Sequence, residues 1–146
     1  MVSLKEAFDL AFDLADEAKR QGDVPVGAVI VKDGEILAAS YNKREANKSP
    51  TAHAEILAIE EAAKKTGDWR LDGASLIVTL EPCIMCAGAI INSRIKNIFF
   101  SAFDSDFGAC GGHINVFNKS YIICGGMYKE KGEALIKDFF RNRRKD

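Results

Sequence analysis

Several features are scarce in this sequence of 146 residues, and each scarcity narrows what the chain can be. No apolar run approaches 18 residues, so we expect no membrane span. Only 3 prolines are present, and neither a repeat nor a low-complexity segment is visible, which excludes a fibrous repeat protein and a disordered tail. Basic residues do not outnumber acidic ones either. The 20 Lys and Arg against 21 Asp and Glu give a net charge of −1, which excludes a general basic coat for nucleic acid but allows a local basic patch.

The four cysteines stand at positions 83, 86, 110 and 124. Residues 1–20 have the pattern of an amphipathic helix rather than a basic segment followed by an apolar block, so we expect no signal peptide and a cytoplasmic protein. Cysteines in that compartment are reduced, and closely spaced pairs indicate metal ligands before they indicate disulfides.

The order of helical and strand patterns predicts one three-layer α/β domain over residues 1–146, with helices on both faces of a sheet. We predict helices at 3–21, 52–65, 83–91 and 133–144, and strands at 26–31, 35–41, 74–80, 95–102 and 121–124. Residues 42–50 are predicted to form a polar loop, and residues 103–120 a long loop. A structureless loop of that length inside a domain is usually functional.

Helical spacing also predicts which side chains face the core. In the second helix these are Ile56, Leu57, Ile59 and Ala63, and in the last helix Leu135, Ile136, Phe139 and Phe140. Cys124, in an apolar strand, is predicted to be a small core residue.

Two short motifs indicate chemistry. His53-Ala54-Glu55 begins one predicted helix, and Pro82-Cys83-Ile84-Met85-Cys86 begins the next. Cys83 and Cys86 share one helical face, and the positive end of the helix lowers the pKa of a thiol there. One imidazole and two thiolates provide three zinc ligands, whereas a structural zinc site normally has four. The pattern therefore predicts a catalytic zinc with one open position.

Glu55 lies two residues from His53 and is not needed as a ligand. A carboxylate there can take a proton from water and pass it to a leaving nitrogen. Cys110 remains a possible fourth ligand, which would remove the open position. We interpret His113 as a loop residue, although contact with substrate is an alternative.

Residues 51–55 (TAHAE) and 79–90 (TLEPCIMCAGAI) resemble the bacterial tRNA-specific adenosine deaminases of the zinc-dependent cytidine/deoxycytidylate deaminase superfamily. Residues 24–29 (VPVGAV), 92–95 (NSRI) and 138–144 (DFFRNRR) agree with that family too, so the resemblance runs over nearly the whole chain. It implies a cytidine-deaminase-like α/β/α fold with a central mixed five-stranded sheet, and a homodimer. It also implies conversion of adenosine to inosine at the wobble position of a tRNA, with an arginine tRNA as the expected partner.

The resemblance also implies roles for single residues. His53, Cys83 and Cys86 would bind one zinc ion per chain, and Glu55 would move protons. Asn42 matches an asparagine that bonds the flipped base, and Asp104 an aspartate near the ribose. The full set of expected substrate contacts is Asn42, Ala54, Asp104, Phe140, Arg141 and Arg143. Asn42 has the alternative of a turn residue, and Asp104 that of a plain loop carboxylate.

The loop after position 102 departs from the family. Phe103 and Asp106 flank Asp104, where the family commonly has basic residues; Asp106 would repel phosphate, and Phe103 could stack on a base. Cations at 141, 143, 144 and 145 suit a phosphate grip or merely a solvated helix end. Two other functions therefore stay open: a deaminase of free cytosine or guanine, and a zinc-stabilised nucleic-acid-binding module without catalysis.

Overall fold

The computed structural model describes residues 1–144, and the side chains of residues 1–143. Lys145, counted among the terminal cations, lies outside the described residues. The elements follow in the order α1 (Leu4–Arg20), β1 (Gly27–Lys32), β2 (Glu35–Tyr41), α2 (Arg44–Asn47), α3 (Ala54–Thr66), β3 (Ser75–Leu80), α4 (Ile84–Ser93), β4 (Asn97–Ala102), β5 (Ile122–Cys124) and α5 (Lys129–Arg144).

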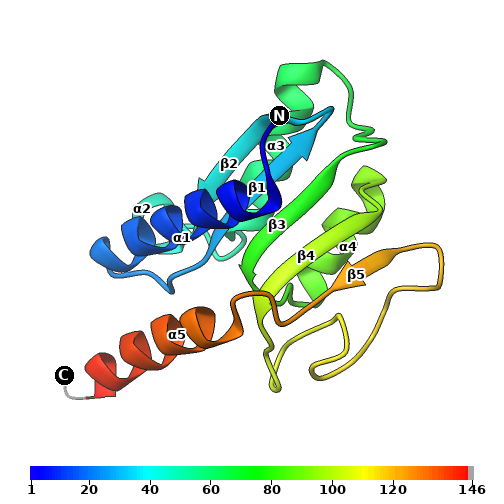
Figure 1. Ribbon diagram of the computed structural model, residues 1–146. Coiled ribbons are helices and arrows are strands. Elements are labelled where there is room, and N and C mark those ends of the chain that lie inside the picture. Colours follow the sequence, from blue (N-terminus) through cyan, green and yellow to red (C-terminus); the bar gives the residue numbers. More distant parts are fainter. Residues whose placement is uncertain (145–146) are drawn as a thin grey trace.

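The five strands form one mixed sheet in the order β2-β1-β3-β4-β5 (Figure 1). β1 is antiparallel to both of its neighbours, β2 and β3, whereas β3, β4 and β5 run parallel to one another. The strands end at residues 80, 102 and 124 on one side of the sheet, and the loops that follow them gather there. In an open α/β sheet, ligands bind outside such carboxyl ends.

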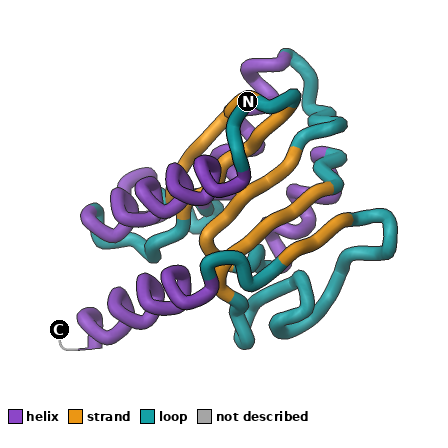
Figure 2. Tube along the Cα trace, in the orientation of Figure 1, coloured by secondary structure: helices purple, strands orange, loops and turns teal. Residues whose placement is uncertain are grey.

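Helices cover both faces of the sheet, as Figure 2 shows. On one face α1 packs Phe8 and Phe12 against Val29 and Ile77. On the other face α3 and α4 cover a core that includes Ile30, Leu76, Val78, Ile98 and Phe100. The α/β/α architecture expected from the sequence is therefore confirmed.

Local sequence patterns correctly predicted where most of the helices and strands begin and end. The first helix begins with a capping box in which the Ser3 side chain accepts from the Glu6 backbone N–H and the Glu6 side chain accepts from that of Ser3. The hairpin turns at Asp33 and Gly34, both with positive φ, which matches the twist of the flanking strands. None of the described helices combines the length and the apolar composition that crossing a bilayer requires.

The face of α3 differs from the prediction. Its fully buried apolar residues are Ala54, Ala58 and Ala62, spaced four apart, while the larger Ile56, Leu57 and Ile59 are only partly buried, as is Ala63. Small side chains at i, i+4 and i+8 let a helix approach a sheet closely, so shape decided the buried face rather than hydrophobicity alone.

Two apolar side chains were wrongly assigned to the core. Cys124 is exposed, because it lies on the edge strand β5 beyond the cover of the helices. Phe139 is buried but Phe140 is 45% exposed, since neighbouring residues on a helix point about 100° apart. Leu135 and Ile136 are partly buried, between these extremes.

The expected polar loop at 42–50 contains a one-turn helix, α2. The residue before it, Lys43, makes no side-chain cap. Instead the Glu45 N–H donates to Asp23 Oδ2 at 3.0 Å, and Asp23 is buried. A carboxylate distant in sequence therefore caps this turn, which no local pattern could indicate.

Substitution of Gly27 tests how closely α1 packs against the sheet. A Cβ built on Gly27 would lie 1.9 Å from the Ala11 carbonyl oxygen, so Gly27→Ala should lower the free energy of unfolding by about 1–3 kcal/mol or more. Gly88 in α4 is the matched control, because its Cβ would meet nothing within 4 Å; Gly88→Ala should be neutral or stabilising by up to about 1 kcal/mol. Urea unfolding measures the stability of both variants. Equal midpoints for Gly27→Ala and Gly88→Ala would contradict the close packing of α1 against β1.

Candidate active site

Two helix N-termini carry the predicted metal ligands to one point. His53 is the N-cap residue of α3 and Cys83 is that of α4, while Cys86 lies in the first turn of α4. Both helices pack on the same face of the sheet. Each helix directs the positive end of its dipole at the site, which stabilises thiolates there.

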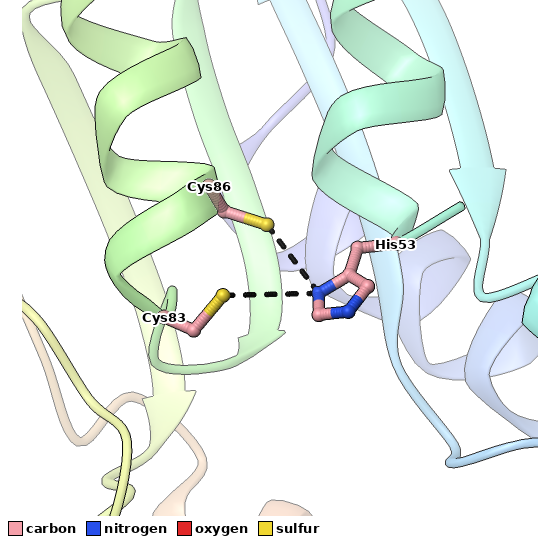
Figure 3. Close-up of side chains that lie close together, drawn as sticks. All are labelled: His53, Cys83 and Cys86. Atoms are coloured by element: carbon pink, nitrogen blue, oxygen red, sulfur yellow. Dashed lines mark hydrogen bonds between the residues drawn. The ribbon is translucent and has the colours of Figure 1, made fainter. Parts of the chain in front are cut away.

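The three ligand atoms have the spacing that zinc requires. His53 Nδ1 lies 3.8 Å from Cys83 Sγ and 3.5 Å from Cys86 Sγ, and all three atoms lie within 4.8 Å of one another (Figure 3). A tetrahedral zinc with ordinary Zn–N and Zn–S bonds separates its nitrogen and sulfur ligands by about 3.6 Å. These residues therefore fit the ion in both donor type and distance.

Cys83 and Cys110 differ sharply as candidate ligands. The hydrogen bond from the Cys86 thiol, with a further contribution from His53, lowers the pKa of Cys83 to about 4. Burial instead raises the pKa of Cys110 to about 12. The pKa of Cys86 is raised as well, by its hydrogen bond to Cys83 and by burial, so geometry rather than thiol pKa separates the predicted ligands from Cys110. Cys110 also lies outside the ligand group found among the described residues.

Glu55 is buried in the first turn of α3, with 4% of its surface exposed. Burial raises the pKa of its carboxyl group above the ordinary value for glutamate. It nevertheless lines the same cavity as His53 and Cys83. A carboxyl group that holds a proton more readily than usual, beside a metal site, suits general acid–base catalysis.

This cavity has a volume of about 750 Å³ and opens between the ends of the sheet strands and α5. Of the expected substrate contacts, it is lined by Asn42, Asp104, Phe140 and Arg143. Ala54 and Arg141 are not among its lining residues. Arg141 lies instead in a separate groove between α1 and α5, with Asp16 and Asp138.

The side chain of Asn42 is held in place by a hydrogen bond to the backbone of α3. Its Oδ1 accepts from the Ala54 N–H at 2.8 Å, which occupies that N–H and joins the end of β2 to the start of α3. With the oxygen engaged, the side-chain NH₂ group is the part of Asn42 that remains to donate into the cavity.

Asp104 shapes the loop that carries it. Its Oδ1 accepts from the backbone N–H groups of Asp106 and Phe107, each at 3.0 Å. Asp104 therefore acts as the local loop carboxylate that the sequence analysis gave as the alternative. The same residue also lines the cavity. His113, in the same long loop, is exposed and is not a lining residue.

The sequence reading missed Glu81, which lies directly before Pro82. This carboxylate is 2% exposed; Oε1 accepts from the Asp104 N–H at 2.9 Å, and Oε2 from the N–H groups of Cys110 and Gly112 at 2.8 Å each. A Cβ at Gly112 would lie 2.1 Å from Glu81 Oε1, so the loop needs glycine there. The glycines at 108 and 112 were the visible signal of this close approach.

Arg44 was missed as well. It lines the cavity, and its Nε lies 3.2 Å from Oδ1 of the buried Asp23. The same carboxylate therefore caps α2 and orients a guanidinium group at the site.

Comparison with known proteins agrees with this geometry. The family model of the cytidine and deoxycytidylate deaminase zinc-binding region matches residues 1–102. The tRNA-specific adenosine deaminase of Bacillus subtilis (strain 168) is 45% identical over 136 residues, which cover 90% of this chain and 84% of that protein.

Two solved structures show the same fold. One, from work on A-to-I editing by tRNA deaminases at the wobble position of transfer RNA, has a TM-score of 0.84 and 35% identity, and the match covers 90% of this chain and 99% of that one. The other, guanine deaminase from Bacillus subtilis, has a TM-score of 0.68 and 42% identity, over 72% of this chain and 68% of that one.

Metal analysis of purified variants tests the ligand set. We expect about one zinc per chain in the wild type and almost none in Cys83→Ala, because two ligands cannot replace three. Cys110→Ala is the matched control and should keep its zinc. Full zinc in Cys83→Ala would contradict the assignment, and loss of zinc in Cys110→Ala would instead indicate a four-ligand structural site.

Proposed function

The chain belongs to the zinc-binding cytidine and deoxycytidylate deaminase family, and we propose that it converts adenosine to inosine at the wobble position of a tRNA anticodon loop. The observation that carries this proposal is the 45% identity to a tRNA-specific adenosine deaminase over 90% of the chain. A guanine deaminase is also similar, so the substrate needs direct testing. The proposal treats residues 1–146 as one deaminase domain.

In this proposal His53, Cys83 and Cys86 would hold one zinc ion per chain, three ligands where a structural site normally has four. Zinc bound there would supply Lewis acidity, which makes a water molecule nucleophilic near neutral pH. Two thiolates and a neutral imidazole balance the charge of the ion, so the site carries no surplus charge into a buried region.

Glu55 moves the protons of the reaction. Its carboxylate takes a proton from the attacking water, whose oxygen bonds to C6 of adenine, and delivers that proton to N1. It then takes the proton of the new C6 hydroxyl group and delivers it to the departing amine, so that the C6–N bond breaks as the C6 carbonyl forms. Adenosine and water thus become inosine and ammonia. Burial of Glu55, which raises its pKa, favours a group that both accepts and returns protons.

The depth of the site requires an unpaired adenosine. An adenine inside a duplex cannot reach a buried carboxylate, whereas a base in an anticodon loop can enter the cavity. We assign the side-chain NH₂ of Asn42 to hydrogen bonding with this base, and Asp104 to the ribose. Ala54 contributes through the N–H that fixes Asn42 rather than through a direct contact.

The surroundings of the cavity support an RNA partner. Phe140 is 45% exposed and lines the cavity with Arg143 from the next turn of α5, which suits stacking and phosphate contact with flanking nucleotides. An arginine tRNA is the proposed substrate, and a tRNA substrate places the enzyme in the cytoplasm. A homodimer is proposed as well, as the resemblance to this family implies.

Analysis of the inosine formed tests both the reaction and the identity of the deaminated nucleobase in one experiment. After incubation with an arginine-tRNA anticodon stem-loop, mass spectrometry should find inosine only at the wobble position, and Glu55→Ala should retain zinc but react about 10²–10⁴-fold more slowly. Free guanine and cytosine are incubated in parallel. Their efficient turnover, with no inosine in any anticodon loop, would replace this proposal with a free-base deaminase; zinc without deamination of any substrate would leave a binding module.

The two arginines on α5 provide a second test. Arg143 lines the cavity, whereas Arg141 lies in the groove beside Asp138. Arg143→Ala should weaken binding of the stem-loop and lower the slope of its salt dependence by about one phosphate contact. Arg141→Ala, the matched control, should leave both unchanged in a filter-binding titration. Equal losses in the two variants would show that α5 attracts RNA only through its general charge.

A further inference from the structure

Two phenylalanines stand exposed beside the cavity. Phe103 is 46% exposed and Phe107 is 72% exposed, and both line the cavity. Apolar rings in contact with water are usual as single residues, but two of them at the edge of a candidate active site indicate a surface that another molecule covers.

The loop that carries both phenylalanines is fixed by hydrogen bonds of its backbone. The Phe107 N–H donates to Asp104 Oδ1 at 3.0 Å, and the Asp104 N–H donates to the buried Glu81. The Phe103 ring packs edge-on against Phe100, with centroids 5.0 Å apart and an interplanar angle of 85°. A base that stacks on Phe103 therefore meets a ring that is already in place, which lowers the entropic cost of binding.

The charged residues that line the cavity differ in sign from one element to another. Asp104 and Asp106 lie in the loop of the phenylalanines, whereas Arg44, which is paired with Asp23, comes from α2 and Arg143 from α5. The acidic loop repels phosphate, and Arg143 attracts it. A single RNA strand is thus directed to place its backbone towards Arg143 and a base towards the rings.

We propose that Phe103 and Phe107 form a stacking platform for one unpaired base adjacent to the reacting adenosine. This inference rests on the proposed function and deepens it. Aromatic side chains bind single-stranded nucleic acid by stacking without regard to sequence, and the platform replaces the phosphate contacts that basic residues in this loop would make. Recognition on this side of the cavity is therefore insensitive to salt, in contrast to that by Arg143.

Fluorescence of 2-aminopurine tests the platform directly, because stacking quenches it. The fluorescent base replaces the nucleotide on the 5′ or the 3′ side of the wobble adenosine, and the protein carries Glu55→Ala so that the RNA is not consumed. We expect quenching at one of the two positions. Phe107→Ala, added to that background, should reduce the quenching, because only the Phe103 ring is left, and should weaken binding about 5- to 150-fold at every salt concentration, with an unchanged salt slope.

Two further variants separate stacking from loss of apolar surface. Phe107→Trp should restore the quenching and Phe107→Leu should not. Trp69→Ala, which removes an aromatic ring that is 52% exposed but outside the cavity, should bind as tightly as its parent. Because Phe107 is largely exposed, none of these results depends on a loss of folding.

The platform is wrong if Phe107→Ala binds the stem-loop within twofold of its parent, or if its loss of affinity is accompanied by a reduced salt slope. Quenching at neither position would also overturn it. These results do not depend on the proposed function. The proposed function is tested separately, by the formation of inosine by the enzyme with an intact Glu55. Inosine formation with an unaffected Phe107→Ala variant therefore rejects the platform alone.

Discussion

The meeting of two helix N-termini beside the end of β3 is the constraint on which the site depends. α3 and α4 begin at the same edge of the sheet, with His53 and Cys83 as their N-cap residues. Unpaired backbone N–H groups and aligned peptide dipoles make this edge electropositive, which favours thiolates and an ionised carboxylate where a neutral environment would oppose them. Burial acts in the opposite direction on Glu55, and the balance between the two creates a carboxyl group suited to proton transfer.

Two buried carboxylates hold the irregular segments around this centre. Glu81 accepts three backbone N–H groups from the loop after β4, and Asp23 accepts from the turn that carries Arg44. These bonds satisfy N–H groups that the backbone of the two segments leaves without a partner in this structure, and such hydrogen bonds to a charged group contribute about 1.5–3 kcal/mol each. The loops are therefore tied to the same elements that position the predicted metal ligands.

In the proposed function, chemistry and recognition consequently occupy different parts of the fold. The predicted ligands and Glu55 come from the first turns of two packed helices, where movement is restricted by the core. Phe103, Asp106 and Phe107 come from a loop, and Arg143 from the last turns of α5. Loops on a rigid scaffold can change without disturbing the reaction centre. The departures of this sequence from its family after position 102 fall in such a loop, next to an unchanged set of predicted ligands.

The sequence by itself determined the alternation of helices and strands, the capping box at Ser3 and Glu6, and the ligand types at 53, 83 and 86. These are encoded locally, by periodicity, capping and the spacing of motifs. Tertiary structure decided which surfaces those elements share. It buried the alanines of α3 rather than its larger residues, left Cys124 exposed on an edge strand, and gave Glu81 and Asp23 their partners. It also directed Arg143 towards the cavity and Arg141 away from it, because two positions on a helix turn the side chain through about 200° and only packing against the sheet fixes which direction faces the site.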